Sequence, residues 1–106
     1  MDVLNLTKKY FEAFSNKNIE ELSLIYSENV TLIDWDIDIN GKNKVLKANS
    51  ELFNLNFQLI IKSIYVLDKK TFNEITIIIN EEELKIIDVI DFDDDSKIKS
   101  IVAYKR

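Results

Sequence analysis

The sequence predicts a single α+β domain with helices in its first half and an antiparallel sheet in its second half. Before Phe53, apolar residues recur mostly at helical spacing. After Phe53, four segments rich in Ile and Val are separated by short polar breaks. At 106 residues the chain can build one hydrophobic core but not two. We therefore expect the helices to cover one face of the sheet.

The first half is predicted to contain three helices and one strand. A helical stripe opens the chain and is formed by Val3, Leu6, Tyr10, Ala13 and Phe14. A second helix begins after Asn18, an N-cap with Glu21 three residues later, and its buried stripe is Ile19, Leu22, Ile25 and Tyr26. The segment "NVTLIDW" (29–35) is typical of a strand. Gly41, the only glycine, precedes a third helix over residues 42–53.

The second half is predicted to form four strands, at residues 57–67, 72–79, 83–92 and 97–105. The breaks between them, at 68–70, 80–82 and 93–96, are short and polar. Short connections join neighbouring strands that run in opposite directions, so this part of the sheet is expected to be antiparallel.

The composition removes several classes of function. A net charge of −5 argues against a nucleic-acid or anionic-membrane partner. Without Cys or His, thiolate chemistry, the commonest metal ligand and the commonest general base are all missing. We therefore expect neither a metal nor a cofactor. No apolar run reaches membrane-spanning length and no signal-peptide pattern opens the chain, so the expected location is cytoplasmic.

One acidic residue interrupts an otherwise apolar strand face. In "LKIIDVIDF", alternation places Asp88 on the same face as Leu84, Ile86, Ile90 and Phe92. An ionised carboxylate there would lose its hydration without obvious compensation. Three interpretations remain open: the alternation is misread, a partner satisfies Asp88, or Asp88 stays protonated and takes part in chemistry.

The order helix, helix, strand, helix and four long strands resembles the nuclear transport factor 2-like (NTF2-like) fold, also called SnoaL-like. The segment "KKYFEAFSNKNIEELSLIYSENVTLID" is similar to the opening of that fold, and the resemblance covers nearly the whole chain. It implies a cone in which three N-terminal helices pack on a strongly curved, mainly antiparallel sheet, with a pocket at the mouth.

Within that fold the chain looks most like ketosteroid isomerase. That family has a Tyr in the first helix, matched by Tyr10 in "KKYFEAF", and a catalytic Asp at the end of the first strand, matched by Asp34 in "TLID". A second, protonated Asp on a late strand is matched by Asp88, and a further network Tyr by Tyr26. The third network Tyr of some members falls on Asn49, which is a departure from the pattern.

The resemblance implies a cofactor-free proton transfer next to a carbonyl, the isomerisation of a double bond. Asp34 would be the base, while Tyr10 and protonated Asp88 would hold the carbonyl oxygen. Apolar neighbours raise the pKa of a buried carboxyl, and ketosteroid isomerase itself is the standard example of this effect. The ligand is expected to be a small hydrophobic carbonyl compound. The residues expected to contact it are Tyr26, Trp35, Phe53, Ile86 and Ile90.

Other interpretations of the same residues stay open. Asp88 could be a structural group bonded to Tyr10 or Tyr26, and Asp36 and Asp38 compete with Asp34 for the role of base. The run 93–95 lacks the spacing and glycine of a calcium loop and is expected to be a solvated turn. The Asp-Arg-Asp set of an epoxide hydrolase requires an internal Arg, which this chain lacks, because its only Arg is Arg106.

The apolar residues on the other face of the strand from Asp88, such as Ile87 and Val89, suggest a second buried sheet surface. We therefore expect a homodimer formed through the sheets. The alternative to an enzyme is a non-catalytic NTF2-like domain that binds a small hydrophobic ligand or serves dimerisation.

Overall fold

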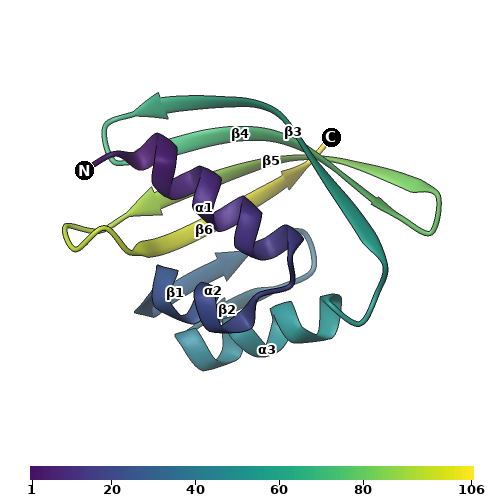
Figure 1. The fold of residues 1–106 in the computed structure, drawn as a ribbon, viewed down its shortest axis with the longest axis horizontal. Coiled ribbons are helices and arrows are strands. Elements are labelled where there is room, and N and C mark those ends of the chain that lie inside the picture. Colours follow the sequence, from purple (N-terminus) through teal and green to yellow (C-terminus); the bar gives the residue numbers. More distant parts are fainter.

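The computed structural model describes residues 1–106 and contains three helices and six strands (Figure 1). In chain order they are α1 (Val3–Ser15), α2 (Ile19–Ile25), β1 (Tyr26–Ile33), β2 (Asp38–Asn40), α3 (Lys42–Leu52), β3 (Phe57–Leu67), β4 (Lys70–Ile79), β5 (Glu82–Phe92) and β6 (Ile98–Lys105). The predicted α+β class is confirmed.

All six strands belong to one sheet in the order β2-β1-β6-β5-β4-β3. The four long strands form the predicted antiparallel meander, because β3 pairs with β4, β4 with β5 and β5 with β6. β1 joins this meander through a parallel pairing with β6. The short strand β2, which the sequence did not predict, returns along β1.

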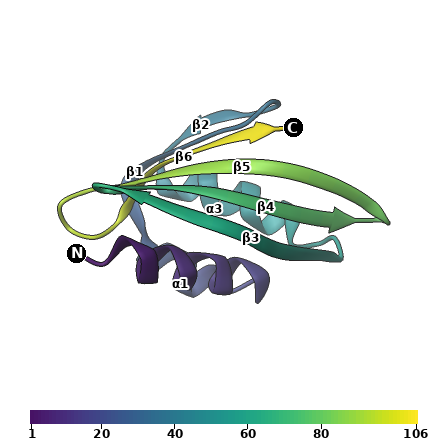
Figure 2. The same cartoon turned by 90° about the horizontal axis from the view of Figure 1, so that it is seen from above.

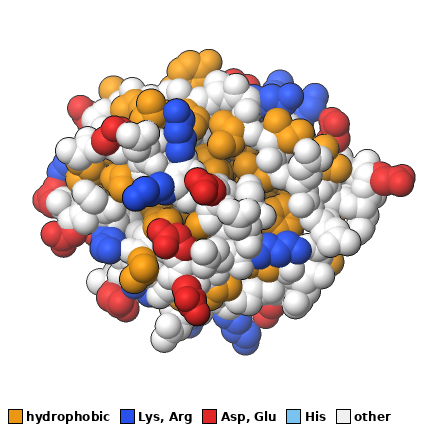
Figure 3. All heavy atoms as spheres, in the orientation of Figure 1, with side chains coloured by type: hydrophobic (Ala, Val, Ile, Leu, Met, Phe, Trp, Pro, Cys, Tyr) orange, Lys and Arg blue, Asp and Glu red, His pale blue; other side chains and the backbone are white.

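The three helices lie on one side of the bent sheet, which we call the inner face (Figures 1 and 2). α1 contacts β3 and β4, whereas α3 contacts β1 and β2 near the other edge. The core between these layers contains the fully buried side chains Phe11, Leu22, Tyr26, Val30, Val45, Ile90, Phe92, Ile98 and Ile101. On the helix-bearing side, charged groups of both signs are scattered between apolar atoms (Figure 3). None of the three helices has the length and apolar character needed to cross a bilayer.

α2 begins as predicted but ends earlier than expected. The Asn18 side chain accepts a hydrogen bond from the Glu21 N–H at 3.1 Å, which caps the helix. The prediction that Tyr26 belongs to the buried stripe of this helix is wrong, because Tyr26 has extended backbone angles and begins β1. The reason is tertiary: the backbone of Tyr26 pairs with Ile98 of β6.

The connection between β2 and α3 depends on the only glycine. Gly41 has a φ of 107°, in the region that favours glycine, and caps α3 without a side-chain hydrogen bond. Its N–H donates to the Val30 carbonyl at 2.8 Å, which holds the start of α3 against β1. Gly41 thereby sets where α3 lies on the inner face.

Candidate functional site

A cavity of about 250 Å³ lies on the inner face of the sheet. Its walls come from α1, the end of β1 and the following turn, α3, and strands β4, β5 and β6. Fourteen of its 17 lining residues are hydrophobic, so the few polar groups on its wall stand out. Those with a polar side-chain end are Tyr10, Asp34, Trp35, Asn49 and Asp88.

Asp88 lies on the inner face of β5, as the alternation predicted. Its residue is 8 % exposed, and Ile86 and Ile90 on the same face are buried. Directly across the sheet, its partner on β6 is Ala103, whose small side chain also lines the cavity. Asp88 therefore has an apolar surrounding with open space beside it.

The carboxyl of Asp88 makes no hydrogen bond with another side chain of the protein, so the interpretation of Asp88 as a polar cross-link to Tyr10 or Tyr26 is wrong. Burial, together with the smaller effect of the nearby negative charge of Asp34, raises the pKa of Asp88 from 3.8 to about 7. Near neutral pH part of the molecules then carry a neutral carboxylic acid at this position, which can donate a hydrogen bond.

A buried polar chain supports the strand beneath Asp88. The side-chain amide of Asn73, directly opposite on β4, donates to the Asp88 carbonyl at 3.1 Å and to the Thr71 hydroxyl at 3.0 Å. Thr71 in turn shares a hydrogen bond of 2.9 Å with Thr7 of α1. These contacts tie α1 to the sheet and fix the backbone that presents Asp88.

Asp34 lies just after the end of β1, in the turn that leads to β2. One carboxylate oxygen, Oδ1, accepts hydrogen bonds from the backbone N–H groups of Asp36 at 2.7 Å and Ile37 at 2.8 Å. The other oxygen has no hydrogen-bond partner in the protein, and Asp34 lines the cavity. Asp36 and Asp38, the competing candidates, are exposed and are not part of the cavity wall.

Tyr10 reaches the cavity from α1 and is 4 % exposed. Burial raises the pKa of its phenol well above 10, and the neighbouring Tyr26 and Asp88 act in the same direction. The Tyr10 hydroxyl is therefore a neutral donor over the whole physiological range. Tyr10, Asp34 and Asp88, which lie far apart in the sequence, are brought together on one cavity.

Tyr26 lies behind the cavity wall and contacts Asn49. Its hydroxyl donates to the Asn49 side-chain oxygen at 2.7 Å. Tyr26 is 1 % exposed and is not part of the lining, so the prediction that it contacts the ligand is corrected. The donation to Asn49 leaves the Tyr26 oxygen free to accept from Tyr10, and a hydrogen bond between the two hydroxyls raises the pKa of Tyr10 and lowers that of Tyr26, which agrees with the predicted link between these tyrosines.

The remaining expected contact residues divide into two groups. Ile86 and Trp35 line the cavity, and the Lys105 ammonium lies 5.2 Å from the centre of the exposed Trp35 ring. Ile90 and Phe53 do not line it. Ile90 is fully buried deeper in the core, and the Phe53 ring packs against Phe14 at 5.1 Å. Sharing a strand face with Asp88 was not enough to place Ile90 at the same depth.

Asn49 is a polar cavity residue that the sequence indicated only as a departure from the third network Tyr of the ketosteroid isomerase pattern. It lies on the same side of α3 as Val45 and Leu52, four residues earlier and three later, and is 5 % exposed. A polar residue on the buried stripe of a helix was the available signal. The isoleucines Ile75, Ile77 and Ile79 of β4 also line the cavity, and their alternation with polar residues in "NEITIII" was only partly informative.

The chain has the NTF2-like fold. No protein-family model and no curated protein matches the sequence. Solved structures match closely in shape. An NTF2-like protein of unknown function from Cytophaga hutchinsonii aligns over 100 % of this chain and 91 % of its own, with a TM-score of 0.88 and 12 % identity.

Two further solved structures of this fold carry the names of enzymes. A "putative ketosteroid isomerase" from Kribbella flavida covers 98 % of this chain and 77 % of its own, with a TM-score of 0.91 and 17 % identity. An LEH-like epoxide hydrolase from M. tuberculosis covers 98 % and 82 %, with a TM-score of 0.83 and 14 % identity. At such low identity these similarities establish the fold alone, and the chemistry has to be argued from the site.

Proposed function

We propose that the protein catalyses proton transfer next to the carbonyl group of a compact hydrophobic compound, moving a double bond into conjugation. The observation that carries this proposal is the meeting of Asp34, Tyr10 and Asp88, whose pKa is raised to about 7, on one largely apolar cavity. Such a reaction needs a base and two neutral hydrogen-bond donors on an apolar cavity wall.

In the proposed reaction Asp34 takes a proton from the carbon between the carbonyl and the double bond. The electron pair moves into a dienolate, and the developing negative charge on oxygen is held by the Tyr10 hydroxyl and by protonated Asp88. Asp34 then returns the proton to the far carbon of the former double bond. Substrate and product are isomers, so the balance requires no cofactor. Because Asp88 donates only when protonated, turnover is expected to fall as the pH rises through about 7.

The two structural neighbours named as enzymes, an isomerase and an epoxide hydrolase, use different reactions. The residues of this cavity favour the isomerase reaction. An epoxide hydrolase of the Asp-Arg-Asp kind needs an arginine beside its carboxylates. The single arginine, Arg106, lies outside the cavity, with its guanidinium 3.9 Å from the Glu74 carboxylate. The two carboxylates and the tyrosine of the isomerase scheme all line the cavity.

The size of the cavity favours a small substrate. Its volume of about 250 Å³ lies below the range of about 300–1,000 Å³ that is typical of ligand pockets. We therefore propose substrates with one or two rings rather than a steroid.

The proposal is tested with 3-cyclohexen-1-one, whose conversion to the conjugated ketone is followed by ultraviolet absorbance. Replacing Asp34 by Asn removes the base and is expected to lower kcat by at least about 100-fold. Asp36→Asn, in the same turn but outside the cavity, is the matched control and should retain activity.

If a panel of such ketones shows no turnover while a cavity ligand raises the melting temperature, the protein is a binding module and the catalytic proposal fails. Equal activity of the wild type and Asp34→Asn would exclude Asp34 as the base.

A further inference from the structure

Asn49 is a polar residue of the cavity that the proposed reaction does not use. It lies on the inner stripe of α3 between Val45 and Leu52, with 5 % of its surface exposed. Leu52 and Asn49 both line the cavity. A primary amide at such a position needs partners for its carbonyl oxygen and for its two N–H groups.

The two ends of the Asn49 amide have different surroundings. Its oxygen Oδ1 accepts the hydrogen bond from the Tyr26 hydroxyl at 2.7 Å. Its nitrogen Nδ2 makes no hydrogen bond in the protein. Nδ2 is not fully enclosed by the protein. Asn73 Oδ1 is the only fully buried side-chain nitrogen or oxygen that lacks a hydrogen-bond partner. Since Asn49 lines the cavity, the open side of Nδ2 is the cavity.

Tyr26 determines which end of the amide faces the cavity. Burial raises the pKa of Tyr26, so its phenol keeps its proton and must donate it to an acceptor. The acceptor it reaches is Asn49 Oδ1, which leaves Nδ2 on the opposite side of the amide. The Tyr26 oxygen can accept from the neighbouring Tyr10 hydroxyl while its proton goes to Asn49 Oδ1, and this buried hydrogen bond holds the amide in one orientation.

We infer that Asn49 is a ligand-binding residue whose Nδ2–H donates a hydrogen bond to an acceptor oxygen of the bound molecule, and that Tyr26 is its positioning residue. The matching ligand class is a compact apolar skeleton with a carbonyl oxygen. This inference deepens the proposed function by adding a third neutral donor, and it rests on that function only for the identity of the oxygen.

Binding of 1-tetralone and of tetralin, which lacks the carbonyl, tests the inference by titration calorimetry without turnover. Asn49→Ala is expected to weaken tetralone binding about three- to tenfold, the usual effect of one hydrogen bond, and to leave tetralin binding unchanged. Ser50→Ala, on the exposed side of the same helix, is the matched control and should change neither. An equal loss of both ligands would mean that Asn49 only packs against them, and would overturn the inference.

A second measurement covers the case in which Asn49→Ala does not fold. The infrared C=O stretch of tetralone bound to the wild type is expected to lie at lower frequency than that of tetralone bound to Tyr26→Phe, which keeps the amide but releases its orientation. Identical frequencies would overturn the positioning role.

Binding separates this inference from the catalytic proposal. If no ketone is turned over but Asn49→Ala still discriminates tetralone from tetralin, the Asn49 assignment stands and the proposed reaction fails. If the wild type binds neither molecule, the assignment is overturned as well.

Discussion

At the scale of single residues, the same burial that gives Asp88 its chemical character also makes it costly for stability. An ionised carboxylate in this position loses water and lies near the negative charge of Asp34. The folded protein therefore binds the Asp88 proton more tightly than the unfolded chain does. Keeping this carboxyl buried therefore lowers the free energy of unfolding at neutral pH.

This difference predicts how stability depends on pH. Between the unfolded value of 3.8 and the folded value of about 7, the folded state holds more protons, so the free energy of unfolding falls as the pH rises. The stabilising contribution is present in full below 3.8 and is lost as the pH rises through about 7. A shift of this size corresponds to a loss on the order of 4 kcal/mol.

Urea denaturation from pH 4 to pH 8 of the wild type and Asp88→Asn measures this loss. The variant lacks the titrating group, so its advantage over the wild type should grow with pH. Asp38→Asn, exposed in β2, controls for a general change in charge. Parallel curves for wild type and Asp88→Asn would show that Asp88 titrates alike in both states.

At the scale of elements, the segment from Asp34 to Gly41 sets the geometry of the site. Asp34 closes the turn with its side chain, β2 returns along β1, and Gly41 starts α3, which carries Asn49. A change in this segment therefore moves both the proposed base and the proposed ligand donor. Its one conformational exception is the positive φ of Gly41.

Gly41→Ala tests whether the positive φ at this position alone makes glycine necessary. No atom lies within 4 Å of the position that an added Cβ would occupy, so steric clash with a neighbour does not contribute. The cost comes from the φ of 107°, and we expect a loss of about 1–3 kcal/mol in the free energy of unfolding. Urea denaturation provides the measurement, with Lys47→Ala on the exposed side of α3 as control. A loss no larger than that of the control would contradict the backbone argument.

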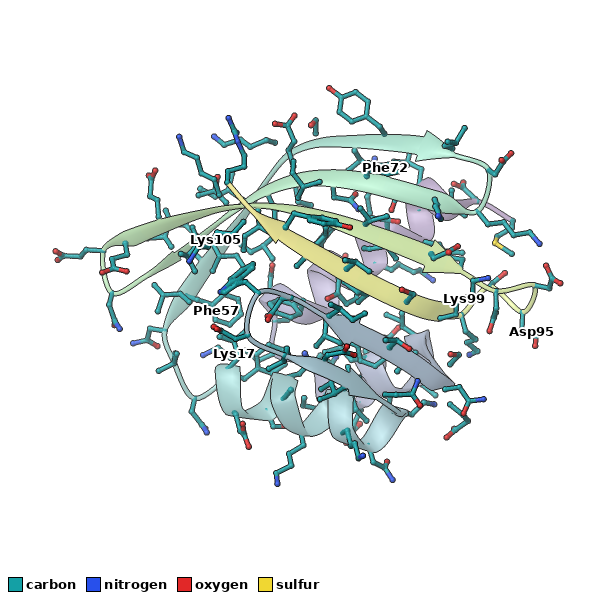
Figure 4. All side chains as sticks on the ribbon, turned by 180° about the vertical axis from the view of Figure 1, so that it is seen from behind. Lys17, Phe57, Phe72, Asp95, Lys99 and Lys105 are labelled. Atoms are coloured by element: carbon teal, nitrogen blue, oxygen red, sulfur yellow. The ribbon has the colours of Figure 1, made fainter.

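At the scale of the whole molecule, the outer face of the sheet carries an apolar row that no helix covers. Strand pairing aligns Tyr65, Phe72, Val89 and Val102 across β3, β4, β5 and β6, and Figure 4 shows Phe72 on this side. Tyr65 is 61 % exposed. Because Glu74, Lys85 and Arg106 flank the same face, it carries both signs of charge and can match a copy of itself about a two-fold axis. We propose that a second copy of the chain covers this row.

A charge placed in the middle of the row tests this assembly. Val89→Lys should convert the expected dimer to a monomer, because each interface would bury two unpaired ammonium groups. Light scattering coupled to size exclusion measures the mass. Lys62→Ala, at the edge of the face, should leave it unchanged. A wild type that remains monomeric at high micromolar concentration would rule out this interface.

Several features followed directly from local patterns along the chain. The class of the fold, the capped start of α2, the antiparallel meander and the inner-face position of Asp88 depend on periodicity, turn residues and caps, which act over a few residues. The helical interpretation of Tyr26 and the missed strand β2 failed for the opposite reason, because both depend on strand pairing. Tyr26 pairs with Ile98, which is distant in the sequence, and β2 pairs with β1 across the turn at residues 34–37.

The sequence by itself determined which groups are present: an Asp after the first strand, an Asp on an apolar strand face, a helix tyrosine, and no His, Cys or internal Arg to offer another chemistry. Only the tertiary structure decided that Asp34 rather than Asp36 or Asp38 lies on the cavity, that Ile90 and Phe53 do not, and that Tyr26 serves Asn49. Depth below a surface and the direction of a hydrogen bond depend on elements that meet in space, and periodicity along one strand or helix does not contain that information.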